Sequence, residues 1–472
     1  MTPGLPVPDG RVLSTLMEDG SRRWLHPRLA AGPYLRARRI LAWVLIAVFT
    51  LLPYGKMHGK PLVLLDLPHR EFTIFGFSFL STDTLLLALA LITLILGICL
   101  VTALAGRVWC GWMCPQTVYL EFVFRPIERL FDGPPGARHR PGRKRTTPRT
   151  VAKYAVYLLV SAYLAHTFLA YFVGVEALAQ WVRRSPLEHP APFLVMLAVT
   201  GLMMFDFAVF REQMCLVACP YGRFQSVMLD RDSLIVSYDR RRGEPRGKLG
   251  DRKPGLPHGD CIDCGLCTDT CPTGIDIRDG LQMECIACTQ CIDACNSVMA
   301  RIGKPKGLIR LSSQAAIAGV TARWLRLRVV LYPVLMLVLA AVFSVVLVNK
   351  KSADVMVLQG VGQPFSETSP GEITNQVRVV IQNRSGRDAV YEIDIAGAVP
   401  ARFARQPEAI FLPAGQSAKT PVAIVVPVAA FQRGICDIQL RVSDGQAFQQ
   451  DIACRLLGPV HRVTGNIPGN SK

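Results

Sequence analysis

Charged residues are scarce in this chain. They make up 19% of 472 residues, below the roughly 25% that is usual for soluble domains, while 50% of the residues are apolar. One large soluble globule is therefore excluded. The chain has neither a G-x-G-x-x-G nor a Walker sequence, so no motif supports a nucleotide site. Of its 8 histidines only His166 falls inside a long apolar run, which argues against a bis-histidine haem in the membrane.

Long apolar runs are what the chain has instead. Crossing a bilayer core takes about 20 apolar residues. Four runs are long enough to cross: 84–104, 154–173, 192–210 and 329–348. A fifth run, at 40–54, is shorter. It is not followed by anything like an A-x-A cleavage site, so we expect a retained first span rather than a signal peptide.

Lysine and arginine are unevenly spread between these runs. The segments 1–39 and 105–152 are rich in arginine, whereas the segment 55–83 has only Lys56, Lys60 and Arg70. The positive-inside rule therefore places the first two segments and the long 212–328 loop in the cytoplasm. Five crossings then put the tail outside. The net charge of +18 reflects topology and contact with anionic membrane lipid, and we expect no nucleic-acid partner.

The 212–328 loop contains two cysteine runs with the spacing C-x2-C-x2-C-x3-C. In this spacing three thiolates bind one [4Fe–4S] cluster, and the fourth binds the other cluster. Pro272 follows the first run, whereas Asn296 stands at the equivalent place after the second. The spacing predicts two clusters, one held by Cys261, Cys264, Cys267 and Cys295, the other by Cys285, Cys288, Cys291 and Cys271.

Zinc competes with iron for these eight cysteines. A zinc site takes two C-x2-C pairs and would leave four thiols unexplained. The clusters could also have a purely structural role. Negative charge near a cluster favours its oxidised form and lowers its potential, which suits an electron donor. The acidic residues of this unit are Asp260, Asp263, Asp269, Asp276, Asp279, Glu284 and Asp293, against Arg278.

A different cysteine pair follows the second and the fourth run. Cys110 and Cys114 form the first pair, Cys215 and Cys219 the second, and each pair is followed directly by proline. The i, i+4 spacing puts both sulfurs of a pair on one helical face, and the proline ends or kinks the helix at the second cysteine. Both pairs are expected near the cytoplasmic membrane face.

The surroundings of the two pairs also repeat. Arg107 and Arg211 precede them, and residues 38–130 and 153–235 are each a two-span hairpin ending in C-x3-C-P, which indicates an internal duplication. Packing about a pseudo-twofold axis would bring the four thiols to one site. Soft thiolates select Cu(I), with zinc or cluster iron as competitors. A reversible thiol–disulfide couple, or cysteines that simply fill buried space, would also fit this pattern.

The C-terminal tail differs from the rest of the chain in its pattern of polar and apolar residues. From about residue 353 to 460 it alternates between polar and apolar residues, with turn residues at short intervals, and this pattern predicts an immunoglobulin-like β-sandwich of about seven strands. The last two strands, 436–442 and 448–456, would form a hairpin around 443–446. With a three-residue loop Cys436 would face Cys454 and could form a disulfide; another register would separate them. A docking or scaffold role is the default for this domain.

These features occur in an order that resembles the FixG/RdxA/CcoG family, the cytochrome c oxidase accessory proteins of Gram-negative bacteria. The resemblance covers nearly the whole chain, including both C-x3-C-P units and the linker between the two cysteine runs. It implies a multi-pass inner-membrane protein required for assembling cbb3-type oxidase. It also implies reduction of Cu(II) to Cu(I). The copper positions that it implies are Cys110, Cys114, Cys215 and Cys219.

The expected fold is thus a five-helix transmembrane bundle with an inserted two-cluster bacterial ferredoxin-like α+β domain and a C-terminal immunoglobulin-like β-sandwich. The expected partners are copper ions, copper chaperones, oxidase assembly factors and an unidentified electron donor, and we also allow for a homodimer. The expected domains are 1–39 (cytoplasmic), 40–235 (four spans), 236–328 (ferredoxin-like and connector), 329–348 (fifth span) and 349–472 (periplasmic).

Two other functions compete with a cupric reductase. One is a membrane relay between quinol and an external reductase, as in NapH- and NosR-like proteins with C-x3-C-P pairs beside two clusters. A NosR-like protein would need a large outer flavin domain, for which the tail has no room. The other is an assembly scaffold whose clusters sense oxygen or redox state.

Overall fold

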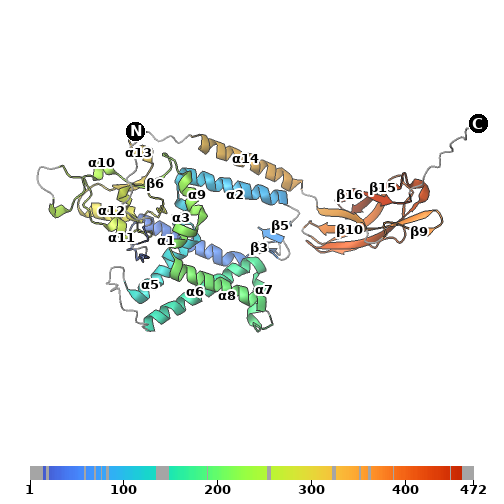
Figure 1. Ribbon diagram of the computed structural model, residues 1–472, viewed down its shortest axis with the longest axis horizontal. Coiled ribbons are helices and arrows are strands. Elements are labelled where there is room, and N and C mark those ends of the chain that lie inside the picture. Colours follow the sequence, from blue (N-terminus) through green and yellow to red (C-terminus); the bar gives the residue numbers. More distant parts are fainter. Residues whose placement is uncertain are drawn as a thin grey trace, which may run out of the picture. The chain divides into compact units, whose positions relative to one another are not determined.

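The computed structural model forms two compact units, residues 1–343 and 344–472, which are described separately (Figure 1). The finer division into five domains stays a prediction. The structure describes residues 14–16, 21–57, 60–67, 71–75, 77–80, 84–133, 148–188, 190–251, 257–320, 326–349, 352–359, 363–385, 387–446 and 448–459. The most basic part of the 105–152 connection and the end of the tail lie outside them.

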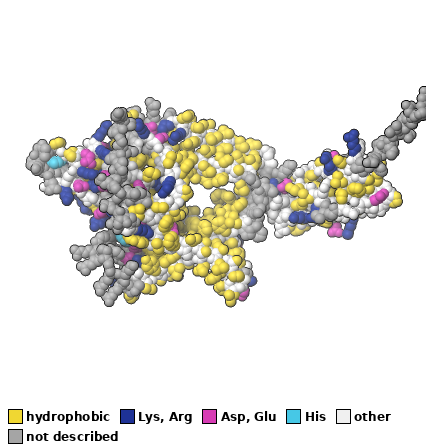
Figure 2. Space-filling model, viewed as in Figure 1, with side chains coloured by type: hydrophobic (Ala, Val, Ile, Leu, Met, Phe, Trp, Pro, Cys, Tyr) yellow, Lys and Arg dark blue, Asp and Glu magenta, His cyan; other side chains and the backbone are white. Residues whose placement is uncertain are grey.

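Four helices in the described ranges are long and apolar enough to cross a membrane. Their outward faces carry bare apolar side chains such as Leu94, 61% exposed, and Leu337, 70% exposed, and Figure 2 shows such side chains gathered over the helical part of the first unit. Lipid is the solvent in which such a surface is stable. The four segments are Leu85–Ala105 (in α2), Pro148–Val173 (α6), Pro190–Phe210 (α8 and the π-helix η3) and Leu327–Val348 (α14).

The expected first span has a different form. Helix α1 covers Pro33–Leu51 and begins before residue 40, so that it contains Arg36, Arg38 and Arg39. Arg38 is 1% exposed and bonds to the backbone of Gly111, so the first part of α1 packs on protein rather than on lipid. A crossing by α1, and with it the five-helix bundle, is therefore not confirmed.

A short antiparallel sheet lies between α1 and α2 in the sequence. Its strands are β3 (Val63–Asp66), β4 (Glu71–Ile74) and β5 (Phe77–Leu80), paired in that order. The apolar stretch 72–80, too short to cross a membrane, thus forms most of a β-hairpin. Its backbone polar groups pair across the strands, which lowers the cost of placing such a segment next to lipid.

The ferredoxin-like region is built from short elements around two cysteine-lined cavities. Strands β6 (Ile235–Tyr238) and β7 (Ile309–Ser312) pair antiparallel and close the region at its two ends. Between them lie α11 (Leu266–Asp269) and α12 (Gln290–Arg301), and each carries part of a cysteine run. The buried core is small and includes Ile292, Met299 and Leu308.

The second unit is an immunoglobulin-like sandwich. One sheet runs β12–β14–β10–β8, with β9 on β10, and the other runs β13–β11–β15–β16. The alternating burial of β10 reflects one face on the core and one in solvent. The strands are β8 (Ala353–Gln359), β9 (Ser366–Ser369), β10 (Glu372–Asn383), β11 (Ala389–Ala396), β12 (Arg402–Phe403), β13 (Ile410–Leu412), β14 (Ser417–Pro427), β15 (Ile435–Ser443) and β16 (Gln449–Leu457).

The final hairpin forms where the sequence predicted it, but its register separates the two cysteines. Cys436 pairs with Leu456, and Cys454 pairs with Ile438. Both thiols are buried and free. Of the two registers that the sequence left open, the structure has the one that separates the cysteines, because strand pairing ends at Ser443 and Gln449 and the turn is longer than three residues.

Candidate iron–sulfur and thiol site

The eight cysteines of the two runs line two separate cavities. We call them cavity A and cavity B. Cavity A is lined by Cys261, Cys264, Cys267 and Cys295, and cavity B by Cys271, Cys285, Cys288 and Cys291, with Cys267 at its edge. Each cavity is thus lined by three cysteines of one run and the fourth cysteine of the other run, as the spacing predicts.

Left-handed backbone between the cysteines bends each run around its cavity. Gly265 lies at φ 69°, where glycine is unstrained. Asp263, Ala287 and Thr289 take positive φ values of 50°, 53° and 62°, although each has a side chain. Such conformations cost about 1–3 kcal/mol each and persist where the surroundings fix them, often at functional sites. Here they turn successive thiols toward the same interior.

Burial keeps the thiols of the two cavities in their neutral form until a metal binds them. Burial raises the pKa of Cys267 to about 11, of Cys285 to about 11 and of Cys295 to about 12. These thiols would stay protonated at neutral pH, and only a bound cation would recover the cost of ionising them. Four thiols per cavity match the ligand set of a [4Fe–4S] cluster, so the residues present fit two such clusters.

The two C-x3-C-P pairs are not each on one continuous helix. Cys110 lies in α3 (Val108–Trp112), but Cys114 is extended and precedes α4 (Pro115–Tyr119). Cys215 lies in the π-helix η4 (Met214–Ala218), and Cys219 precedes α9 (Pro220–Met228) in the same way. The proline disfavours helix at the residue before it, as expected. A shared helical face, which the i, i+4 spacing had suggested, was therefore wrong.

The thiols of the two pairs nevertheless lie near one another. Burial raises the pKa of Cys215 to about 12, and the neighbouring Cys114, Cys110 and Cys219 raise it further. Burial also raises the pKa of Cys110, to which Cys114 and Cys219 contribute. We call these four residues the thiol tetrad. Within the described residues, no group of three or more His, Cys, Asp or Glu side chains is arranged so that it could hold one metal ion. Binding an ion at the tetrad therefore requires these side chains to move.

Cys110 also has a polar contact inside the bundle. Its Sγ donates to Oε1 of Gln225 at 3.0 Å. The Gln225 amide in turn donates to Thr102 at 3.0 Å and to Tyr221 at 2.6 Å. Gln225 is 1% exposed and lies on α9. The contact links the first half of the repeat to the second.

The tetrad adjoins cavity B. Cys110, Ile286 and Cys288 form one small buried cluster. Gly111 lies so close to this loop that a Cβ on it would come within 2.4 Å of the Ile286 oxygen and 2.9 Å of the Cys288 Cα. The Trp112 indole donates to the Ala287 carbonyl at 3.3 Å. A side chain at position 111 would therefore push the two sulfur-bearing segments apart.

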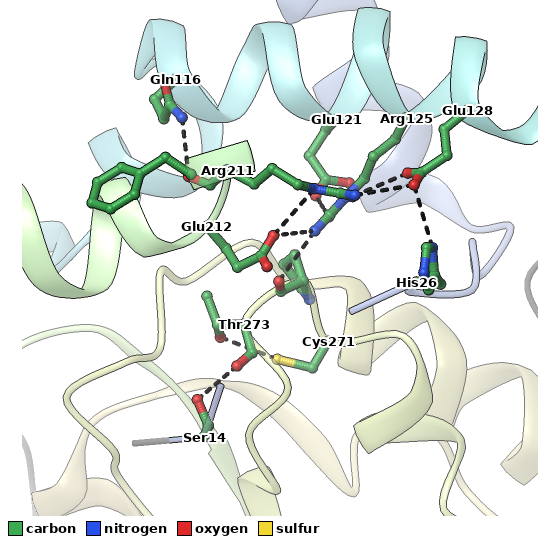
Figure 3. Close-up of polar contacts among 12 residues, drawn as sticks. Ser14, His26, Gln116, Glu121, Arg125, Glu128, Arg211, Glu212, Cys271 and Thr273 are labelled. Carbon is green, nitrogen blue, oxygen red and sulfur yellow. Dashed lines mark hydrogen bonds and ion pairs between the residues drawn. The ribbon is translucent and has the colours of Figure 1, made fainter. Parts of the chain in front are cut away.

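A buried network of charged side chains holds the other flank of cavity B (Figure 3). Arg125 is 1% exposed and pairs with Glu121 and with Glu212, the latter at 3.5 Å. Its Nη2 also donates to the Pro272 carbonyl at 3.3 Å, next to the ligand Cys271. This network was not predicted from the sequence, because its members come from segments far apart along the chain.

Arg211 and the N-terminal segment complete this network. The Arg211 guanidinium donates both Nη atoms to Glu128, each at 3.0 Å, and His26 lies 3.5 Å from the same carboxylate. Ser14 donates to the Thr273 carbonyl at 2.7 Å. Leader, membrane helices and ferredoxin-like region thus meet at one polar cluster. Arg211, noted in the sequence only as a repeated neighbour of the second pair, has this structural role.

Three family descriptions match the chain. Residues 210–314 match a 4Fe-4S dicluster domain, and residues 87–134 match a 4Fe-4S binding domain. Residues 343–459 match the IG-like fold at the C-terminal of FixG. Together these matches support bound iron–sulfur clusters and the immunoglobulin-like tail. The match over residues 210–314 includes the cysteines of cavities A and B and the pair Cys215 and Cys219. The match over residues 87–134 includes the pair Cys110 and Cys114.

Several known proteins are similar to the chain along its length. It is 32% identical to Protein RdxA of Cereibacter sphaeroides, a match over 89% of this chain and 90% of RdxA. Protein RdxB of the same organism is also 32% identical, over 91% of this chain and 94% of RdxB. The nitrogen fixation protein FixG of Rhizobium meliloti is 34% identical, over 63% of this chain and 58% of FixG.

Proposed function

Since the chain belongs to the family of the FixG and RdxA proteins, and is a membrane iron–sulfur protein of the electron-transfer type, we propose that it reduces Cu(II) to Cu(I). In this proposal the copper is the substrate and binds at Cys110, Cys114, Cys215 and Cys219. The Cu(I) formed is handed to copper chaperones and assembly factors that load a cbb3-type oxidase in the bacterial inner membrane.

One observation carries the proposal. The buried side chains of Cys110 and Cys288 belong to the same small cluster, with Ile286 beside them. One sulfur belongs to the thiol tetrad and the other to cavity B, so an electron leaving cavity B enters the tetrad without crossing solvent or lipid. Cys267 lines cavity A and touches the edge of cavity B, which joins the two cavities in the same way.

The chemistry of the tetrad suits the product of the reaction. Thiolates are soft ligands that favour Cu(I) over harder ions. Burial raises the pKa values of Cys110, Cys114 and Cys215, so these thiols release protons when they bind the metal. Arg107 lies close to two of them and favours their ionised form. Product binding thus helps to draw the reduction forward.

The electron balance is simple. Each Cu(II) takes one electron to become Cu(I), and a [4Fe–4S] cluster, when bound, supplies one electron at a time. The cysteines of cavities A and B hold the two clusters, and an unidentified cytoplasmic donor returns the electrons. The ferredoxin-like region and the N-terminus then belong in the cytoplasm and the tail in the periplasm, as the arrangement of basic residues predicts.

A direct test follows the clusters and the copper together. Purified protein is reduced under anaerobic conditions, freed of reductant and given Cu(II) with a Cu(I)-specific chelator. We expect the iron–sulfur absorbance to return to its oxidised form as about one Cu(I) per cluster appears. Protein with oxidised clusters is the control, because it has the same free thiols. Equal Cu(I) from both samples would refute the proposal.

One feature favours the competing quinol relay. A cavity of about 290 Å³, lined mainly by apolar and aromatic residues with His166 and Arg184 among them, lies near the start of α8. Such a cavity suits an amphiphile with a polar head. The tetrad, however, follows the other end of α8, and no further redox group is apparent between them in the described residues. Reduction of the clusters by quinol, with no copper reduction, would favour this relay.

A further inference from the structure

Arg107 lies between the thiol tetrad and cavity B, whereas the proposed function uses it only at the tetrad. We propose that this buried cation is a positioning residue that acts on both sets of thiolates. In this role it raises the reduction potential of the cluster in cavity B above that of the cluster in cavity A, and it strengthens Cu(I) binding at the tetrad. The second effect rests on the proposed function, whereas the first does not.

The contacts of Arg107 place its guanidinium between the two sites. Arg107 is 5% exposed and stands at the start of α3, three residues before Cys110. One Nη donates to the Met283 carbonyl, in the loop that leads to Cys285. The other Nη faces Gly222 on α9, where an added Cβ would lie 3.0 Å from it and 3.1 Å from the Cys215 oxygen. Arg107 therefore touches segments that carry both cysteine pairs and cavity B.

A cavity of about 200 Å³ brings the same groups together. Arg107, Met283, Cys285 and Ala287 share its lining. Cys110, three residues after Arg107, and Cys215, whose carbonyl lies beside the same Gly222 as the Arg107 guanidinium, belong to the tetrad. One guanidinium thus lies beside cysteines that belong to two different sites.

The charge of Arg107 is not balanced by a carboxylate. Among the residues that the structure describes it forms no ion pair, and its Nε is buried without a hydrogen-bond partner. An isolated buried cation is costly, by several kcal/mol even after relaxation. Thiolates on bound metal are the anions that would offset this cost. Among the described residues, the chain thus retains a cation without an ion pair where the thiol tetrad adjoins the thiols of cavity B.

Cavity A has a different balance of charge. Its arginine, Arg278, pairs with Asp276 and also with Asp263, so that two carboxylates surround one guanidinium. At cavity B the buried Arg38 is offset by Asp293, and Glu284 opposes Arg107 at Cys285. Arg107 thus adds a cation without an ion pair to the lining of Cys285 at cavity B, whereas the arginine that lines cavity A is paired with two carboxylates.

This difference gives electrons a direction. Positive charge near a cluster favours its reduced form, and negative charge favours its oxidised form. An electron entering at cavity A therefore moves to cavity B, and cavity B is the one that adjoins Cys110. The sequence alone indicated an acidic, donor-like unit as a whole; the placement of Arg107 distinguishes its two halves.

The test is a redox titration of the two clusters, followed by EPR, in Arg107→Gln, Arg107→Lys and the unchanged protein without copper. We expect Arg107→Gln to lower the potential of one cluster only and Arg107→Lys to restore most of it. Arg402→Gln is the control, because Arg402 belongs to the immunoglobulin-like unit, is 63% exposed and pairs with Glu372. Unchanged potentials in Arg107→Gln would overturn the inference.

Two further measurements keep the outcome unambiguous. If Arg107→Gln fails to assemble clusters, Glu284→Gln is measured in its place, because it removes a negative charge beside Cys285. We expect it to raise the reduction potential of the cluster in cavity B. An unchanged potential in Glu284→Gln would overturn the inference. Cu(I) affinity, measured by chelator competition, should fall in Arg107→Gln and recover in Arg107→Lys. A shifted potential with no Cu(I) binding in any variant would refute the copper function and leave the role of Arg107 at cavity B in place.

Discussion

The side chains of Cys110 and Cys288 pack in one buried cluster, although they belong to different parts of the chain. Cys110 follows the helix α2, and Cys288 lies in the second cysteine run of the ferredoxin-like region. Their contact is supported from the side by Trp112, which donates to the Ala287 carbonyl. The proposed electron path therefore depends on one local packing arrangement, and it can be tested there.

Replacing Cys110 or Cys215 with serine should abolish copper reduction and leave the iron–sulfur absorbance intact. Neither residue lines cavity A or B, whereas both belong to the tetrad. Cys99→Ser is a matched control, because Cys99 is a buried cysteine within the span of α2 and lies outside the tetrad. Copper reduction at the unchanged rate in both tetrad variants would refute the assignment of the site.

The crossed grouping of the cluster ligands can be tested with Cys271. We expect Cys271→Ala to impair the cluster of cavity B, because Cys271 lines that cavity although it belongs to the first run. Iron content should fall by about half, and the EPR signal that remains should match that of cavity A. Cys295→Ala should have the opposite effect. If Cys271→Ala and Cys264→Ala impaired the same cluster, the ligands would not be crossed.

The sequence predicted those parts of the site that depend on local spacing. The two cysteine runs and their crossed grouping follow from residues that are close together in the chain, and the cavities have the same grouping. The four long spans and the main strands of the tail could also be predicted, because they rest on apolar length and on alternation. Their ends differ by a few residues from the expected ones.

Contacts between distant segments could not be predicted. Nothing in the local sequence pairs Arg125 with Glu212, or places Arg107 against the Met283 carbonyl. The recurrence of arginine before each cysteine pair was the available signal, but it did not indicate that Arg107 would be unpaired and Arg211 held by Glu128. The shared helical face failed at Cys114 because the effect of proline on its neighbour outweighs i, i+4 spacing.

Arg125→Met should destabilise the membrane-bound protein by about 3–5 kcal/mol, because it leaves the buried carboxylate of Glu121 without its cation and leaves Glu212 with only Arg22 and Arg211. Arg125 is fully buried, and burial lowers its pKa to about 10, so it is still charged at neutral pH. Thermal unfolding in detergent measures the effect. Adding Glu121→Gln to Arg125→Met should recover part of the loss.

A surface pair provides the control for this loss. Arg405 and Glu408 lie 3.5 Å apart and are both 88% exposed, so Arg405→Met should change stability by less than about 1 kcal/mol. Since Arg125 also bonds to the Pro272 carbonyl, its loss should in addition weaken retention of the cluster next to Cys271. A variant as stable as the unchanged protein would mean that solvent reaches the two carboxylates.

The two cysteines of the tail should stay reduced even under oxidising conditions. In the hairpin of β15 and β16, Cys436 pairs with Leu456 and Cys454 with Ile438, so the thiols are diagonal neighbours. Diagonal Cβ atoms in an antiparallel pair are about 7–8 Å apart, whereas a disulfide requires about 3.8 Å. Both side chains are only 4% exposed, so reagents should modify them only after unfolding. Mass spectrometry of the tail, released by proteolysis without reductant and alkylated in denaturant, should find two modified thiols. A peptide pair joined through Cys436 and Cys454 would show that the strands can shift by two residues, and would contradict the register on which this prediction rests.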